Sequence, residues 1–310
     1  MDKKAVVFGS FVVDLMSRTP HLPSPGETVK GTDFDMGPGG KGFNQCVAAH
    51  KAGIDVSIMT KLGEDEFANV CLDTMTELKM DKSNVLSSSE YGTGIALIMV
   101  DENTAENQIV VVPAACTQIT DEEVEGLRDT LKDSEYVLTQ LETNLSAVEK
   151  LVKIAKETKT KVILNTAPIQ KFDEEMLKDI YMVTPNEVEA QILTGVKIVD
   201  LESAEAAAKW FFDRGVQKVI ITLGKNGVYV NDGEKSDIIP AYKVDAIDTT
   251  GAGDAFNGGL LAALTEGKDI WKSCKFGNAV GALSVQKKGT TKSMPTREDI
   301  DKFLKEFGND

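Results

Sequence analysis

The sequence predicts an α/β fold with a three-layer α/β/α core, a mostly parallel central sheet and a small additional β-sheet. Short apolar runs such as 161–165 and 218–223 alternate with longer helical stretches along most of the chain. Because these runs are apolar on both faces, they are typical of parallel strands that helices cover on both sides. Strand-like stretches at 27–36 and 94–113 interrupt the alternation and predict the additional sheet.

Length, charge and cysteine content exclude several classes of protein. With 310 residues the chain can form one large domain and a small appendage. A formal net charge of −15 and a pI near 4.7 disfavour nucleic acids and anionic membranes as partners. The first apolar run is too short for a signal-peptide core or a membrane span. The four cysteines form no C-x-x-C pair and no metal spacing, so we expect reduced thiols in a cytoplasmic protein.

The core elements are expected in a regular order. The first strand, within 5–15, stops at Gly9-Ser10 and resumes before Asp14. Thr120 and Glu123 fit a capping box at the start of a helix. Further strands are expected at 55–60, 136–141, 161–165, 181–184 and 218–223. Helices are expected at 44–52, 66–79, 121–131, 145–157, 204–214, 255–266, 270–287 and 297–307.

The additional sheet is expected from two separate stretches of the chain. The segment 20–26 is rich in proline and glycine and predicts a turn, after which 27–36 alternates as a strand does. Strands at 94–100 and 108–113 are joined by a polar hairpin at 101–107.

Polar side chains follow the predicted strands at the point where each strand ends. Open α/β sheets bind ligands beyond the carboxyl ends of their strands. Because six such positions are polar, a binding site explains them better than a chance set of caps and turns. The positions are Asp14, Glu142, Asn165, Asn186, Thr222 to Gly224, and Asp248. For Asp14 alone, a strand-end carboxylate that faces water is an equally good interpretation.

The stretch 245–259 predicts an anion site next to a base. Gly251-Ala-Gly253 leads into an apolar-periodic helix, whose first turn offers unpaired amide donors to a phosphate. A carboxylate at this place, Asp254, is explained by removal of a proton from the group that attacks the phosphorus. A glycine C-cap followed by an Asp N-cap explains the same residues equally well on local chemistry.

Together with a second glycine-rich motif, this stretch resembles the signatures of the ribokinase-like (PfkB-type) sugar kinases. The second motif is Gly39-Gly-Lys-Gly-Phe-Asn-Gln45, about 200 residues earlier. The similarity continues through Gly9-Ser10, Leu141-Glu142, Asn165 to Pro168, Pro185 to Glu187, Thr222 to Gly224 and Lys287 to Gly289. It covers essentially the whole chain.

The resemblance implies an ATP-dependent kinase. The γ-phosphoryl group of MgATP would pass to a primary hydroxyl of a small sugar, D-ribose in first place, giving ribose 5-phosphate. The resemblance also implies a ribokinase-like fold with a core of residues 1–10, 44–90 and 118–310. Residues 11–43 and 91–117 would form a β-sheet lid that excludes water and pairs with a second lid in a homodimer.

The resemblance also implies a role for each matching residue. The catalytic set is the base Asp254 with the amides of Gly251, Ala252 and Gly253. The sugar set is Asp14, Gly40, Lys41, Gly42, Asn44, Glu142 and Asp254. The ATP set is Asn186, Thr222, Leu223, Gly224, Lys225, Asn226, Gly227, Gly253 and Asn278. Mg²⁺ would be held through water by Asn186 and Glu189, and K⁺ near Asp248, Thr250, Ser284, Lys287, Gly289 and Ser293.

Structural explanations exist for two of these motifs. Asn186 with first-turn glutamates is a common N-cap, which is compatible with a metal role. Residues 37–40 would by themselves be a flexible turn before a helix.

Two positions depart from the pattern of the ribose-specific members of the family. Val12 replaces an asparagine that contacts ribose, and Phe43 replaces a small residue, so the predicted pocket is more apolar and tighter. A deoxyribokinase activity on 2-deoxyribose is therefore an alternative, as is another pentose or a ketohexose.

Other classes of function fit less well. Phe256 takes the place of the third glycine of a Rossmann motif, and no Walker-type G-x-x-x-x-G-K-[ST] occurs. A non-catalytic sugar sensor on the same fold is the remaining competitor. The retention of Asp254, Asn186 and Glu189 argues against it.

Overall fold

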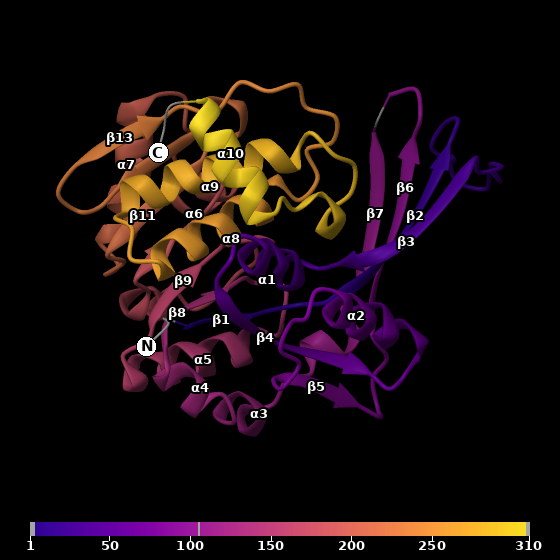
Figure 1. The fold of residues 1–310 in the computed structure, drawn as a ribbon, viewed down its shortest axis with the longest axis horizontal. Coiled ribbons are helices and arrows are strands. Elements are labelled where there is room, and N and C mark those ends of the chain that lie inside the picture. Colours follow the sequence, from indigo (N-terminus) through magenta and orange to yellow (C-terminus); the bar gives the residue numbers. More distant parts are fainter. Residues whose placement is uncertain (1–3, 105, 308–310) are drawn as a thin grey trace.

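The computed structural model, which describes residues 4–104 and 106–307, contains a large sheet flanked by helices and a smaller sheet beside it (Figure 1). In the described residues the large sheet has nine strands in the order β13-β12-β11-β10-β9-β8-β1-β4-β5. They are β1 (Lys4–Phe8), β4 (Asp55–Gly63), β5 (Val85–Ser88), β8 (Ser134–Thr139), β9 (Lys161–Leu164), β10 (Met182–Val183), β11 (Lys218–Thr222), β12 (Val228–Asn231) and β13 (Ser236–Ile239). All neighbours are parallel except β11 with β12 and β12 with β13.

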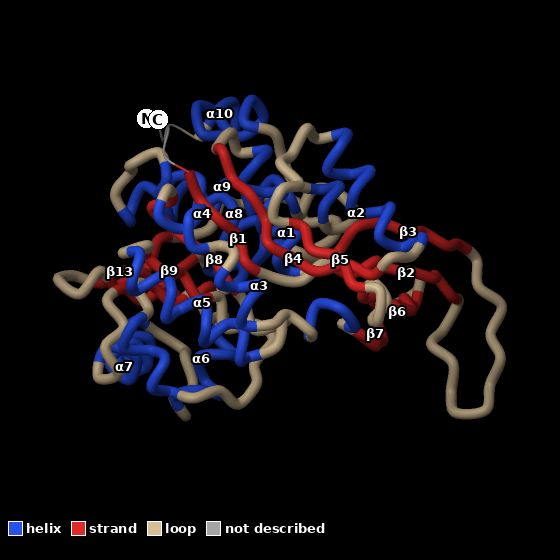
Figure 2. Tube along the Cα trace, turned by 90° about the horizontal axis from the view of Figure 1, so that it is seen from below, coloured by secondary structure: helices blue, strands red, loops and turns tan. Residues whose placement is uncertain are grey.

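Helices cover both faces of this sheet (Figure 2). One face carries α1 (Lys41–Lys51), α2 (Glu66–Glu77), α8 (Ala252–Thr265) and α9 (Ile270–Ser284), with α10 (Arg297–Glu306) on α9. The other carries α3 (Asp121–Glu125), α4 (Arg128–Lys132), α5 (Leu145–Thr158), α6 (Glu187–Thr194) and α7 (Leu201–Phe212). Successive strand residues alternate between the two layers, so Val7 belongs to one core cluster and Val6 to the other. The predicted three-layer core is therefore confirmed, and double burial explains the continuous apolar runs.

The smaller sheet projects to one side of the core (right in Figure 1). Its order is β3-β2-β6-β7, with β2 (Val12–Thr19), β3 (Asp33–Gly39), β6 (Gly94–Asp101) and β7 (Asn107–Val112). The registers place Asp14 opposite Gly37 and Ala96, and Met16 opposite Ile98. Because side chains alternate between the faces of a strand, Asp14, Met16 and Ile98 share one face. The predicted additional sheet is confirmed. Residue 105, in the predicted hairpin 101–107, lies outside the described residues.

The strand expected at 27–36 lies at 33–39 instead. Pairing with β2 begins at Asp33 opposite Arg18 and continues through Gly37-Pro38-Gly39, which as a motif indicated a turn. Pro38 is tolerated because β3 is an edge strand, where a missing N–H leaves no neighbour unpaired.

Several helix and strand predictions also needed correction. The helix expected at 121–131 is divided at Gly126 into α3 and α4, although the capping box at Thr120 is confirmed. Helix α1 begins at Lys41, three residues early, since Gly40 adopts φ of 88° and turns the chain into the helix. The short strands β5, β12 and β13 were not predicted, because each is too brief to show a clear period. Of α6 only the start, at the N-cap Asn186, was predicted.

No helix in the described parts of the chain combines the length and the apolar character that a bilayer span requires.

Helices α1 and α8 approach each other closely at Gly258. A Cβ atom at Gly258 would lie 2.4 Å from the Cβ of Ala48 and 2.5 Å from the carbonyl oxygen of Gln45. Because this contact is one turn away from Asp254, it fixes the distance between the start of α8 and residues Asn44 and Gln45.

We predict that Gly258→Ala lowers the free energy of unfolding by about 1–3 kcal/mol, since the added methyl group forces the two helices apart. Chemical denaturation would measure the change. The matched control is Gly281→Ala in α9, where the nearest atoms lie 3.5 and 4.0 Å from the new Cβ. That variant is expected to be as stable as the native chain or up to about 1 kcal/mol more stable. Equal stability of both variants would contradict the close contact.

Candidate active site

Four of the six polar positions predicted at strand ends lie at one edge of the large sheet, together with Ser10. Strands β11, β10, β9, β8 and β1 are consecutive neighbours, and their carboxyl ends lead into Thr222, Asn186, Asn165, Glu142 and Ser10. This is the edge at which open α/β sheets bind ligands.

Glu142 holds the start of α1. Its Oε2 atom accepts the backbone N–H of Lys41 at 2.9 Å and the hydroxyl of Ser10. No side chain caps this helix from Gly40, so the carboxylate satisfies one of the free amides and complements the helix dipole. Two residues of the predicted sugar set, Lys41 and Glu142, are therefore in contact.

Asp254 lies in the first turn of α8 and is only 7% exposed. Its Oδ2 accepts from Nδ2 of Asn44 at 3.1 Å, and its Oδ1 accepts from Nε2 of Gln45 at 2.9 Å. Burial raises the pKa of Asp254, while the charge of Lys41 and the two amide donors oppose the rise. In turn, the negative charge of Asp254 raises the pKa of Lys41 above its usual value. A buried carboxylate with a raised pKa next to a cation suits a general base.

The start of α8 is open in front of Asp254. Gly251 is its N-cap with φ of 77°, and no side chain caps the helix. The Ala252 amide bonds to the carbonyl of Thr249 at 3.2 Å, and a Cβ at Gly253 would meet no atom within 4 Å. This helix start therefore has room for an anion such as a phosphate.

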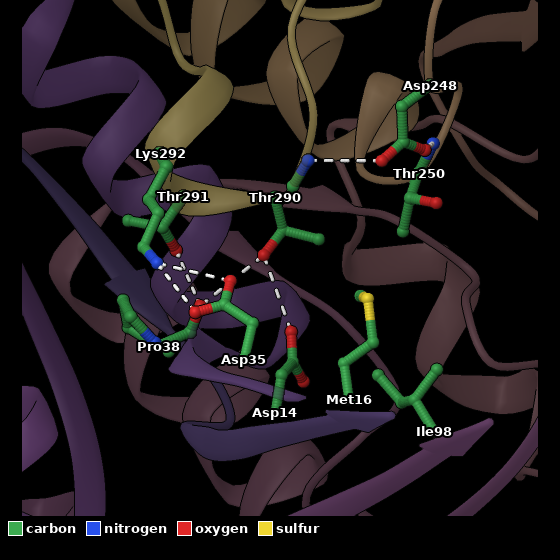
Figure 3. Close-up of a pocket in the computed structure, with 12 residues that line it drawn as sticks. Asp14, Met16, Asp35, Pro38, Ile98, Asp248, Thr250, Thr290, Thr291 and Lys292 are labelled. Atoms are coloured by element: carbon green, nitrogen blue, oxygen red, sulfur yellow. Dashed lines mark hydrogen bonds and ion pairs between the residues drawn. The ribbon is translucent and has the colours of Figure 1, made fainter. Parts of the chain in front are cut away.

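Asp14 faces a pocket between the small sheet and the loop after α9 (Figure 3). Asp14, Met16 and Ile98 line it from the sheet, and Thr290 lines it from the loop. Oδ2 of Asp14 accepts the hydroxyl of Thr290 at 3.4 Å. Burial raises the pKa of Asp14 to about 6; the Thr290 hydrogen bond opposes this rise, and the negative charges of Glu142 and Asp254 add to it.

Asp248 lines the same pocket from the opposite side (Figure 3). Its Oδ1 accepts the Thr250 amide at 2.9 Å, and its Oδ2 accepts the Gly289 amide at 3.0 Å. Burial raises the pKa of this group, but the amides outweigh burial, so the pKa of Asp248 is lower than usual. The other residues of the predicted K⁺ set are close in sequence to these contacts. The Ser293 hydroxyl donates to the Thr290 carbonyl, and the Lys287 amide donates to the Ser284 carbonyl at the end of α9.

Asn186 and Glu189 form a capping box at the start of α6, which confirms the N-cap interpretation. Oε1 of Glu189 accepts from Nδ2 of Asn186 at 2.8 Å, and Oε2 accepts the Asn186 amide at 3.0 Å and the Thr166 hydroxyl at 3.2 Å. Within residues 4–104 and 106–307 no group of three His, Cys, Asp or Glu side chains could hold a metal ion. A metal at this position would therefore depend on water and on oxygens of a bound ligand, as Mg²⁺ commonly does.

The loop after β11 connects the remaining residues of the predicted ATP set. Thr222 forms a bridge with Asn186, and its amide donates to the Pro185 carbonyl at 2.9 Å. Residues Gly224 to Asn226 form a 3₁₀ turn that Leu223 and Gly227 close with a 2.8 Å hydrogen bond. A Cβ at Gly227 would collide with the backbone at Pro240, whose carbonyl accepts from Nδ2 of Asn278 at 3.3 Å. Asn278 and the loop are thus connected through Pro240.

Several polar residues of this region were not predicted as site residues. Gln45 contacts Asp254 directly, Thr290 contacts Asp14, and Gln140, Thr184 and Asn257 complete the surrounding hydrogen bonds. Gln45 stands inside the motif 39–45 and could have been included for that reason. Nothing in the sequence around Thr290 indicated its contact.

The prediction that Phe43 tightens the pocket was wrong. Its side chain has no exposed surface and packs edge-on against Phe11, with ring centroids 5.1 Å apart. Val12 is also buried, with its Cγ1 atom facing Gly94.

Comparison with known proteins shows similarity along nearly the whole chain. The family model described as pfkB family carbohydrate kinase matches residues 2–297. A ribokinase of Haemophilus influenzae is 41% identical and covers 98% of this chain and 99% of its own length. A ribokinase of Staphylococcus aureus is 35% identical, with 97% and 99% covered. A deoxyribokinase of Salmonella typhimurium is 32% identical, with 96% and 97% covered.

Solved structures show the same similarity. Ribokinase from Thermotoga maritima has a TM-score of 0.90 at 33% identity and covers 98% of this chain and 100% of its own. Arabidopsis thaliana ribokinase complexed with ribose and ATP has a TM-score of 0.91 at 29% identity, with 98% and 99% covered.

Proposed function

The chain belongs to the pfkB family of carbohydrate kinases and is a sugar kinase, and we propose that it transfers the γ-phosphoryl group of MgATP to the primary hydroxyl of D-ribose. The observation that carries this proposal is the position of Asp254. Its carboxylate is buried at the open start of α8 and bonded to Asn44, a residue of the other glycine-rich motif. A proton acceptor and an anion site are thus next to the residues proposed to hold the sugar.

In the proposed reaction Asp254 takes the proton of the attacking hydroxyl. Lys41, whose positive charge lies near Asp254, compensates the negative charge that accumulates at this place. The amides of Gly251 and Gly253, and that of Ala252 when it leaves the Thr249 carbonyl, stabilise charge on the transferred group, as donors at a helix start do. Asp14, Asn44 and Glu142 orient the sugar hydroxyls. The small sheet carries Asp14 and closes one side of the pocket, which favours exclusion of water.

The nucleotide is proposed to lie along the loop 222–227 with Asn278 on its other side. Mg²⁺, when bound, would neutralise phosphate charge and be held through water by Asn186 and Glu189. The residues fit this role, because the carboxylate of Glu189 is already oriented by Asn186 and Thr166.

Ribose is proposed as the preferred sugar because ribokinases at 35–41% identity cover nearly the whole chain. The second candidate is 2-deoxyribose. Val12 supports it, since an apolar side chain there cannot hydrogen-bond a sugar hydroxyl, and a deoxyribokinase is 32% identical to this chain.

We predict that the native chain releases ADP from MgATP in the presence of ribose, and that Asp254→Asn lowers kcat by about 10²–10⁴-fold, the range for loss of a general base. A coupled assay would compare ribose, 2-deoxyribose, fructose and tagatose, and calorimetry would measure sugar binding. Asp73→Asn, on the exposed side of α2, is the control and should keep full activity. Tight sugar binding by the native chain without ADP release would instead identify a sensor, and a higher kcat/KM for 2-deoxyribose would identify a deoxyribokinase.

We also propose that K⁺ binds near Asp248 and activates the enzyme. Asp248 stays ionised because two amides donate to it, and it is next to Thr250 and Gly289. The remaining oxygens would come from Ser284, Lys287 and Ser293. The expected result is a higher kcat in K⁺ than in tetramethylammonium, with most of this difference lost in Asp248→Ala. Equal rates of the native enzyme in both salts would refute the proposal.

A homodimer through the small sheet is proposed from its exposed apolar side chains. The registers align Leu15 with Met36 and Leu97, and Leu97 with Val110, on the face opposite to Asp14. Met36, Leu97 and Val110 are 46%, 46% and 59% exposed. An exposed apolar patch of this kind marks an interaction site. Sedimentation is expected to show a dimer that Val110→Asp dissociates, whereas a native monomer would contradict it.

We place the enzyme in the cytoplasm, where ATP is available, and cell fractionation would test this.

A further inference from the structure

Gln45 makes three side-chain hydrogen bonds in the core, and all of its amide protons are used. It lies on α1 and has no exposed surface. Its Nε2 atom donates to Oδ1 of Asp254 at 2.9 Å and to Oδ1 of Asn165 at 3.0 Å. Its Oε1 atom accepts from Nε2 of Gln140 at 2.6 Å.

A backbone carbonyl decides the direction of these bonds. Nδ2 of Asn165 donates to the carbonyl oxygen of Thr184 at 2.9 Å. A carbonyl can only accept, so Asn165 must direct its nitrogen to Thr184 and its oxygen to Gln45. If the amide of Gln45 were rotated, its oxygen would face the oxygens of both Asn165 and Asp254. Gln45 is therefore held as a donor to Asp254.

Asn44 gives the second oxygen of Asp254 the same kind of partner. Its Nδ2 donates to Oδ2, and its own oxygen accepts the hydroxyl of Thr291 at 2.7 Å. Each oxygen of the carboxylate thus has one amide donor, and the backbone carbonyl of Thr184 fixes the direction of the donor from Gln45. Such donors stabilise the ionised carboxylate and offer nothing to the proton of a carboxylic acid.

Thr184, whose carbonyl orients Asn165, also holds the backbone next to Asp254. The hydroxyl of Thr184 donates to Oδ1 of Asn257 at 2.6 Å, and Nδ2 of Asn257 donates to the carbonyl of Gly253 at 2.8 Å. Thr184 therefore holds the first turn of α8 both through the side chain of Asp254 and through the backbone of Gly253.

We propose that Gln45 is a positioning residue of the kinase reaction, which keeps Asp254 ionised and in a fixed orientation for the acceptor hydroxyl. The inference rests on the proposed role of Asp254 as the base. Gln45 has no exposed surface, so it can act on the reaction only through the residues it bonds, of which Asp254 is the base. The sheet orients Asn165, Asn165 orients Gln45, and Gln45 orients the base.

The test replaces Gln45 with methionine, which has a similar length and no donor. We expect Gln45→Met to lower kcat by about 10–100-fold, as the loss of an outer hydrogen-bond partner typically does, with less than about twofold change in KM for sugar and ATP. Without the donor the charged form is less stable, so the pKa of Asp254 rises and the acid limb of the kcat–pH profile moves to higher pH. The control is Gln217→Met, at an exposed residue just before β11, and it should leave kcat and the pH profile unchanged.

Two further measurements separate this role from simple support of the fold. In an Asp254→Asn background, Gln45→Met is expected to lower the residual kcat by less than about twofold, because the two residues act as a unit. Carboxyl-carbon NMR of aspartate-labelled protein, assigned with Asp254→Asn, should show the titration midpoint of Asp254 moving upwards in Gln45→Met.

Gln140→Met provides a milder variant in case Gln45→Met fails to fold. Oε1 of Gln140 is buried without a hydrogen-bond partner, so the substitution removes one unsatisfied oxygen while freeing another on Gln45. Gln140→Met should shift kcat and the pH profile in the same direction as Gln45→Met, by a smaller amount.

A native enzyme that is active with sugar, together with an unchanged kcat and pH profile in Gln45→Met, would overturn the inference. If the native chain does not release ADP with any sugar, the proposed function fails instead, and the NMR midpoint still tests the Gln45 contact.

Discussion

Burial of the carboxylate of Asp254 between two helix starts is the constraint on which the rest of the site depends. An ionised carboxylate taken out of water is costly unless donors surround it. Asn44 and Gln45 supply these donors, and both stand on α1. They reach Asp254 only because α1 and α8 meet without a side chain between them at Gly258. The packing of two helices thus decides whether the charge can exist at this position.

A similar close approach holds the first turn of α1. A Cβ at Gly42 would lie 2.6 Å from the backbone of Gly9, and the Phe43 amide donates to the carbonyl of Ser10 at 2.9 Å. Phe43 in turn fills the core against Phe11. The glycine-rich motif therefore does more than let a ligand approach the backbone. It seats the helix that carries the donors for Asp254 directly on the end of β1.

How much of the fold and of the site could be predicted depended on how far apart in the sequence the contacting residues lie. The alternation of apolar runs and helices predicted the three-layer core, since double burial leaves a continuous apolar pattern in each strand. The glycine-rich motifs predicted that Asn44 and Lys41 lie near Asp254, but the site residues predicted from them did not include Gln45. The bond between Thr290 and Asp14 joins residues that are far apart in the sequence. The bond from Asn165 to Thr184 ends on a backbone carbonyl, which every residue has. Such contacts leave no local pattern. Phe43 was wrongly assigned to the pocket because it stands inside a binding motif. A residue within such a motif can still pack in the core, as Phe43 does.

The two aspartates near the pocket, Asp254 buried and Asp14 half-buried, differ in the chemistry of their partners. Asp254 faces amide nitrogens, which can only donate and therefore favour its ionised form. Burial raises the pKa of Asp14 to about 6, and the hydroxyl of Thr290, which donates to Asp14, opposes this rise. Burial raises the pKa of both groups, so their partners distinguish them: two amides at 2.9 and 3.1 Å hold Asp254, whereas one hydroxyl at 3.4 Å holds Asp14. Carboxyl groups with such different partners are suited to different tasks. The acid on the small sheet is suited to adapt to the sugar, and the acid on α8 is suited to remove its proton.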